Sequence, residues 1–299
     1  MDQLGDGPVT IGDGGLAATI DPQGAQLLRL TDRDGRDLLW DGDPAWWAGR
    51  APILFPVIGL MAGGGYNLGG ERFAMTKHGF ARDRRFAVAA LSERMALFRL
   101  TDDAETRVLW PFAFTLDLLF EVAGEALTVT ATIADTGDRA MPASFGFHPA
   151  FRWPLPYGAP RDRHRIVFET AEPDPIRRIG PDGLLRPDPV PSPVAGDTLV
   201  PDDALFVDDA LILDAVRSRR LVYGADGTPQ IAVRFEGAPV LGIWTKPGAP
   251  FLCIEPWAGL PDPAGYAGDL RDKPGVTSVP PGGTARVTLG IEWLPADTA

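Results

Sequence analysis

The sequence predicts an all-β protein, a large antiparallel β-sandwich, and three observations support this class. In most apolar segments the hydrophobic residues recur at every second position, which is the period of a strand with one buried face. No segment keeps an apolar stripe at helical spacing for three turns. The chain also contains 35 Gly and 30 Pro, which indicate many turns and few long helices. We therefore expect roughly ten or more short strands.

The clearest strand pair lies between residues 110 and 133. Apolar residues alternate from Trp110 to Val122, and after the turn sequence AGEA they alternate again from Leu127 to Ile133. This pattern predicts an antiparallel hairpin. The same alternation, with Gly or Asp-Gly turns nearby, predicts strands within 10–20, 26–40, 219–235 and 285–294. Residues 92–103 fit a strand as well as a helix.

We predict a single domain spanning residues 1–299. The Pro-rich passage 171–201 could be a linker between two domains, but it contains the short apolar islands 176–179 and 183–187 and leads directly into strand-like residues 209–216. A long surface excursion from one core is the better interpretation. The Gly-rich stretch 61–73 lacks the GK[ST] ending of a phosphate loop and predicts a hairpin turn.

Charge and composition limit the partners. The formal net charge of -12 disfavours nucleic acid and anionic membranes, which are bound through clustered Lys and Arg, and leaves a neutral small molecule compatible. The longest apolar passage, residues 51–62, is too short and too interrupted by proline for a membrane helix. The N-terminal residues show no basic stretch followed by an apolar run, so we expect no secretory signal and a cytoplasmic protein.

Cysteine and histidine usage disfavours disulfide and metal chemistry. The single cysteine, Cys253, has apolar neighbours and is expected to be a packed thiol. The three histidines, His78, His148 and His164, show no HxH or HExxH spacing, so no metal site is predicted. No GxSxG motif supports a serine hydrolase. His164 stands among charged residues and is expected to be exposed.

Two polar residues interrupt strongly apolar surroundings. Glu255 ends the apolar row 251–254, and Pro256 follows it, so we expect this carboxylate where a rigid strand gives way to an accessible loop. His148 is surrounded by aromatic residues that could face a ring-shaped ligand. A core histidine bonded to a backbone carbonyl is the alternative for His148.

Five segments in order, 38–59, 77–86, 145–155, 205–218 and 253–262, resemble the aldose 1-epimerase (galactose mutarotase-like) family, in particular its less characterised bacterial branch. The resemblance covers roughly residues 10–295. It implies a galactose mutarotase-like β-sandwich that binds a monosaccharide in an open cleft. It also implies interconversion of the α and β anomers without a cofactor.

Ring opening of a pyranose needs one base at the anomeric hydroxyl and one acid at the ring oxygen. The resemblance implies that Glu255 is the base and His148 the acid, and that His78 contacts the ring-oxygen side and shares the donating or orienting role. Asp209 matches the carboxylate that hydrogen-bonds sugar hydroxyls, with its neighbour Asp208 as the alternative.

The resemblance also suggests an arginine in the sugar site, and both Arg82 and Arg50 are candidates. Either could equally be a surface ion-pair partner. Trp257 could stack on a sugar face or simply cap the core. Two functions follow as hypotheses: a mutarotase acting on a free aldose or a hexose 6-phosphate, and a catalytically silent carbohydrate-binding or regulatory module. The matched acid and base favour catalysis.

Overall fold

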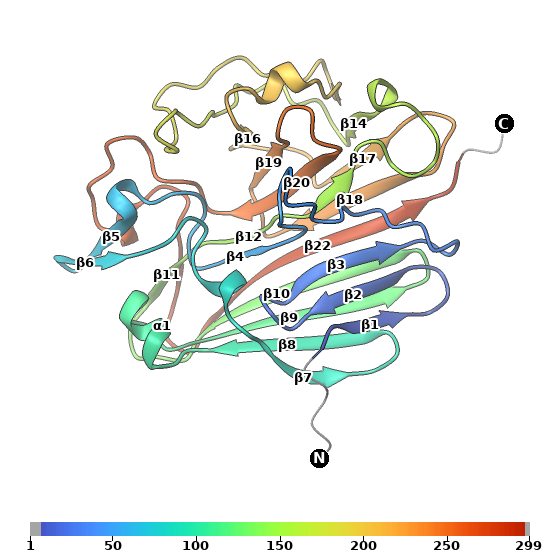
Figure 1. The fold of residues 1–299 in the computed structure, drawn as a ribbon. Helices are drawn as coiled ribbons and strands as arrows, with labels where there is room; N and C mark the ends of the chain where they lie inside the picture. The colour runs from blue at the N-terminus through green and yellow to red at the C-terminus, as the bar shows by residue number, and fades with distance from the viewer. Residues whose placement is uncertain (1–6, 297–299) are drawn as a thin grey trace.

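The computed structural model describes residues 7–296 and consists mainly of antiparallel strands (Figure 1). The all-β prediction is confirmed. The larger sheet has nine strands in the spatial order β15 (Thr198–Leu199), β14 (Arg165–Phe168), β17 (Arg220–Gly224), β18 (Gln230–Glu236), β22 (Thr284–Leu294), β10 (Ala126–Asp135), β9 (Phe114–Ala123), β8 (Met95–Thr101) and β7 (Ala87–Leu91).

A second sheet of six strands lies on one side of the first (Figure 1). Its strands run in the order β16 (Leu211–Leu213), β19 (Val240–Trp244), β20 (Phe251–Ala258), β12 (Phe145–Phe147) and β4 (Ile53–Leu54), and β13 (Ala150–Arg152) also pairs with β20.

Smaller elements complete the described residues. The remaining sheets are β1 (Val9–Gly12), β2 (Ala17–Asp21) and β3 (Gln26–Thr31); β5 (Gly65–Leu68) and β6 (Glu71–Ala74); and β11 (Met141–Ala143) and β21 (Thr277–Val279). The helical pieces are α1 (Ala104–Leu109) and the 3₁₀ turns η1 (Ala62–Gly64), η2 (Ala81–Asp83), η3 (Arg161–Arg163), η4 (Asp203–Phe206) and η5 (Leu270–Asp272). No helix in the range 7–296 is long and apolar enough to cross a membrane.

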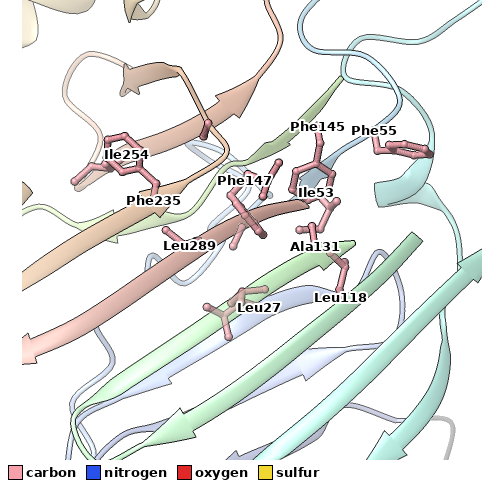
Figure 2. Close-up of a cluster of buried hydrophobic side chains, with 14 of the residues drawn as sticks. Leu27, Ile53, Phe55, Leu118, Ala131, Phe145, Phe147, Phe235, Ile254 and Leu289 are labelled. Atoms are coloured by element: carbon pink, nitrogen blue, oxygen red, sulfur yellow. The ribbon is translucent and has the colours of Figure 1, made fainter. Parts of the chain in front are cut away.

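The core lies between the two large sheets (Figure 2). Apolar side chains of the nine-stranded sheet meet those of the six-stranded sheet, because alternate residues of each strand point to the same face. The residues drawn in this region include Leu118, Ala131, Phe235 and Leu289 from one sheet and Ile53, Phe145, Phe147 and Ile254 from the other. This packing confirms the sandwich.

The predicted hairpin is confirmed with one shift in its boundary. Strands β9 and β10 pair with Ala123 opposite Ala126, and Gly124 supplies the left-handed φ of 58° that the tight turn needs. Trp110 lies before β9 and caps α1, whose N-terminus is fixed by reciprocal hydrogen bonds between Asp103 and Thr106. The ambiguous stretch 92–103 forms β8.

The Pro-rich passage 171–201 is more than a surface excursion. Its apolar residues Ile176, Ile179 and Leu185 are buried, and it runs close to β16, where Arg177 pairs with Ile212. The Gly-rich stretch forms the predicted hairpin between β5 and β6. The single domain stays a prediction, and residues 1–6, on which the expected absence of a secretory signal partly rests, lie outside the described residues.

Candidate active site

Glu255 lies inside strand β20, which continues through Pro256 to Ala258. The expectation that Pro256 ends the strand is therefore wrong. The N–H of Ile254 donates to the carbonyl of Pro149 at 3.2 Å, so the nitrogen of Pro256, two residues on, faces the same neighbour. On this side β20 pairs with β12 and then with β13, and the two strands are separated by a gap. Pro256, which has no N–H to donate, lies opposite this gap.

This interruption places His148 against Glu255. His148 follows β12 directly, and its Nε2 lies 3.2 Å from Oε2 of Glu255. Both side chains are buried, with 8% of His148 and 1% of Glu255 exposed. The imidazole contacts two indoles, with ring centroids 5.0 Å from Trp47 and 5.8 Å from Trp244. The acid and base implied by the resemblance are thus in contact.

His78 lies beside this pair in a defined tautomer. Its Nδ1 accepts a hydrogen bond from the backbone N–H of Gly59 at 3.1 Å, so the proton of the neutral ring is on Nε2. Its ring centroid lies 5.9 Å from that of His148, with the two rings nearly perpendicular. A neutral His78 can therefore donate a hydrogen bond through Nε2.

Two predicted site residues have left-handed backbone conformations. His78 has a φ of 68° and Asp209 a φ of 65°, and among the described non-glycine residues only Ala25 shares this feature. Such conformations are uncommon, and they cluster at functional sites where the surrounding fold enforces them. Asp209 accepts a hydrogen bond from the N–H of Ala210 at 2.7 Å.

These residues surround a cavity of about 190 Å³. This is smaller than the roughly 300–1,000 Å³ of pockets for drug-sized ligands, so it suits one small molecule such as a monosaccharide. Six of the seven predicted residues line it: Glu255, His148, His78, Asp209, Arg82 and Trp257. Other lining residues include Trp47, Lys77, Ile179, Gly183, Trp244 and Pro261.

Trp257 contributes its edge to this cavity. The residue is 3% exposed, and its ring occupies the space left by Gly146 and Gly242, where a Cβ at either position would come within 2.6 Å of it. Its buried indole nitrogen lies close enough to Glu255 to act on that carboxyl group, whose pKa it tends to lower. The burial of the ring leaves little of its face for stacking on a sugar.

Arg50 does not line the cavity. Its guanidinium donates to the carbonyl of Leu28 at 2.9 Å, which fixes the side chain elsewhere, so the expectation for Arg50 is corrected. Asp208 is also outside and forms an exposed ion pair with Arg186. Asp209 is therefore the carboxylate of this pair that faces the cavity.

The expectation that His164 is exposed is wrong. Only 1% of the residue is exposed, because His164, Ile166 and Phe168 occupy alternate positions whose side chains point into the core while the flanking arginines point outward. Its Nε2 accepts from the N–H of Leu155 at 3.0 Å. His164 does not line the cavity and belongs to the core.

Burial disfavours charge on both members of the His148 and Glu255 pair. It raises the pKa of Glu255 well above its usual range, and the nearby Asp209 carboxylate acts in the same direction. Burial lowers the pKa of His148 to about 3, and Lys77 and Arg82 also act to lower it. The two groups titrate as a coupled pair. The pair holds the same number of protons whether it consists of a neutral imidazole and a carboxylic acid or of an imidazolium and a carboxylate.

Cys253 is fully buried, as expected for a packed thiol, but the fold brings it near the acid and base. Potential metal-ligand atoms of His148, Cys253 and Glu255 lie within 4.8 Å of one another. Residue spacing did not predict this cluster, because Cys253 and Glu255 share strand β20 and His148 follows β12. Burial and the charge of Glu255 raise the pKa of the Cys253 thiol, whereas a metal requires the thiolate.

Lys77, Trp47 and Trp244 are site residues that sequence reasoning missed. Lys77 directly precedes His78, and Trp47 belongs to the first of the five segments, so both lay within recognised motifs. Their orientation toward the cavity depends on loop conformation, which periodicity does not predict. Trp244 ends β19 beside β20 and is brought in by strand pairing.

Comparison with known proteins agrees with this fold. The sequence profile of the aldose 1-epimerase family matches residues 8–265. The chromosomal LacX protein of Lactococcus lactis subsp. lactis is 31% identical over 281 residues, which cover 91% of this chain and 94% of that protein.

Two crystal structures are similar over nearly their whole length. A galactose mutarotase-like protein from Lactobacillus casei has a TM-score of 0.89 and 30% identity, covering 96% of this chain and 100% of that one. A galactose mutarotase related enzyme from Lactobacillus acidophilus has a TM-score of 0.87 and 25% identity, covering 98% and 99%. From its sequence match and its sandwich fold, the chain belongs to the aldose 1-epimerase family.

Proposed function

We propose that the protein is an aldose 1-epimerase that interconverts the α and β anomers of a monosaccharide by acid and base catalysed ring opening. The contact of 3.2 Å between His148 and Glu255 in a buried cavity carries this proposal. A binding module would need hydrogen-bond partners for sugar hydroxyls. It would not need a carboxyl group and an imidazole with oppositely shifted pKa values in contact.

In the proposed reaction, the Glu255 carboxylate accepts the proton of the anomeric hydroxyl, and the imidazolium form of His148 gives a proton to the ring oxygen. The electron pair of the former O–H bond forms the aldehyde C=O, and the bond between C1 and the ring oxygen breaks. Rotation about the C1–C2 bond presents the other face of the aldehyde, and the reverse proton transfers close the ring as the other anomer.

His148 is assigned as the acid and His78 as the group that orients the ring oxygen. His78 holds its proton on Nε2 and can donate a hydrogen bond without becoming charged. On ring closure Glu255 returns its proton to the aldehyde oxygen and His148 regains the proton of the open-chain hydroxyl, so both groups are restored after each turnover.

Asp209 and Trp257 are assigned to substrate binding. The Asp209 carboxylate can accept hydrogen bonds from sugar hydroxyls, and its negative charge also helps to raise the pKa of Glu255, which strengthens that group as a base. The indole of Trp257 lines the cavity beside Glu255, where its N–H can donate to the Glu255 carboxylate or to a sugar oxygen.

A phosphorylated aldose is a second candidate substrate, and Lys77 favours it. The Lys77 side chain faces the cavity and makes no hydrogen bond or ion pair with any of residues 7–296, and Arg82 lies at the same cavity. A cation without a partner can bind a phosphate group at modest desolvation cost. The reaction would be the same, and we place it in the cytoplasm.

The test is anomer exchange measured by two-dimensional exchange NMR on a panel of aldoses and their 6-phosphates. We expect accelerated exchange for at least one sugar. Ligand-induced shifts without accelerated exchange for any sugar would favour the silent binding module. Acceleration confined to the phosphorylated sugars would select the second candidate.

A further inference from the structure

A buried ion pair lies behind one wall of the cavity. The ammonium nitrogen of Lys273 is 2.8 Å from Oδ1 of Asp262, and the two side chains are 1% and 3% exposed. Lys273 also approaches the sulfur of Met61 at 3.9 Å. Neither charge touches the cavity, so neither belongs to the proposed acid and base machinery.

Asp262 connects three chain segments around the site. Its Oδ2 accepts a hydrogen bond from the N–H of Ala62 at 2.9 Å, and its own N–H donates to the carbonyl of Leu60 at 3.3 Å. Its carbonyl accepts from the N–H of Leu185 at 2.8 Å. The residue thereby fixes the segment that contains Gly59 and the one that contains Gly183, both of which line the cavity.

The first of these segments holds His78. Gly59 donates its N–H to Nδ1 of His78 at 3.1 Å and accepts a hydrogen bond from the N–H of His78 at 2.8 Å. Gly59 has a φ of 70° and packs so closely on Pro261 that an added Cβ would lie 2.5 Å from it. Pro261 directly precedes Asp262, so the carboxylate anchors both sides of this contact.

We propose that Asp262 is a positioning residue for His78. Its hydrogen bond to the Ala62 N–H holds the segment that contains Gly59, and Gly59 imposes the tautomer in which Nε2 of His78 carries the proton. Lys273 balances the buried charge of Asp262. A buried ion pair is not by itself a source of stability, because desolvation offsets the attraction, and fixing one geometry is an attested use of such groups. The catalytic consequence rests on the proposed function, whereas the tautomer does not.

Two double variants separate the hydrogen bond from the charges. Both Asp262→Asn/Lys273→Met and Asp262→Leu/Lys273→Met remove the ion pair without leaving one charge buried alone, and asparagine and leucine have the same number of side-chain heavy atoms as aspartate. Only the asparagine variant keeps an acceptor for the Ala62 N–H. Asp262→Ala/Lys273→Met makes the same comparison if the leucine variant does not fold, and circular dichroism and the melting temperature show which variants are folded.

The first measurement is the ¹⁵N spectrum of the imidazoles, which is simple because the chain has three histidines. We expect Nε2–H His78 in the wild type and the asparagine variant, and a mixture of tautomers in the leucine variant. We also expect kcat of the leucine variant to fall about 10- to 100-fold below that of the asparagine variant, with a smaller change in KM. A folded leucine variant that keeps the wild-type tautomer overturns the inference, whatever its kcat. If the wild type has no epimerase activity, the proposed function fails and the tautomer still decides this inference.

Discussion

Lowering the pH from 7 to 5 should destabilise the protein, because all three histidines are buried. Burial lowers the pKa of His78 well below its usual range, that of His148 to about 3, and that of His164 below its usual value. In the unfolded chain each histidine binds a proton near pH 6.5. Between pH 7 and 5 the unfolded state therefore gains protons that the folded state does not accept, and the free energy of unfolding falls.

The magnitude follows from the proton count. A histidine that stays neutral in the folded state lowers the free energy of unfolding by about 2 kcal/mol between pH 7 and 5, so His78 and His148 together contribute about 4 kcal/mol and His164 adds to this. Glu255 acts in the opposite direction, since its raised pKa lets the folded state bind a proton that the unfolded state lacks above pH 4.5. This offsets at most about 3 kcal/mol over the same range, so we expect a net loss of at least about 1 kcal/mol.

Urea unfolding at pH 7, 6 and 5 measures this loss, with His164→Asn as the matched variant. His164 lies in the core and outside the cavity, so its removal should lower stability at pH 7 and reduce the loss between pH 7 and 5 by up to about 2 kcal/mol. Imidazole NMR should show no histidine titrating near pH 6.5 in the folded protein. Constant stability from pH 7 to 5, together with a histidine that titrates near 6.5, would show that burial does not keep the histidines neutral.

Two further predictions concern the cavity. Lys77→Met should raise KM for a 6-phosphorylated aldose about 10- to 100-fold relative to the unphosphorylated sugar, as expected for the loss of one charge-assisted hydrogen bond; an unchanged KM ratio in steady-state kinetics would remove Lys77 from the phosphate site. Epimerase activity should survive exhaustive dialysis against EDTA, because proton transfers between the sugar and the side chains of Glu255 and His148 supply the chemistry; lost activity that one metal restores would instead assign a role to the cluster with Cys253.

Sequence reasoning predicted the fold well where period and turn residues agree. The hairpin of β9 and β10 was predictable because apolar and polar residues alternate over about ten positions on each side of a Gly-containing turn. Few structures other than an antiparallel strand pair fit this pattern. The same reasoning failed for His164. Its charged neighbours suggested an exposed residue, although its side chain points to the same buried face as those of Ile166 and Phe168. It also failed for Pro256, because a proline within β20 is tolerated only where the neighbouring strand is interrupted, and sequence does not show that interruption.

The candidate site came mostly from a resemblance to a family. The six predicted residues that line the cavity come from four of the five recognised segments, and the fold brings them together. Arg50 was expected at the cavity from its charge and its place in the first segment, and the sequence does not show that its guanidinium donates to the carbonyl of Leu28. The link from Asp262 to His78 joins residues far apart in sequence through backbone hydrogen bonds, for which no sequence pattern exists.

Anomer exchange by Glu255→Gln tests whether Glu255 is the catalytic base. The substitution keeps the size of the side chain and its hydrogen-bonding capacity but removes the base, and it leaves no buried charge unpaired. On the aldose that the wild type turns over fastest, exchange NMR should show a fall in kcat of about two to four orders of magnitude, with an unchanged circular dichroism spectrum. A folded Glu255→Gln variant that exchanges anomers at nearly the wild-type rate would contradict the account, since the base would then lie elsewhere.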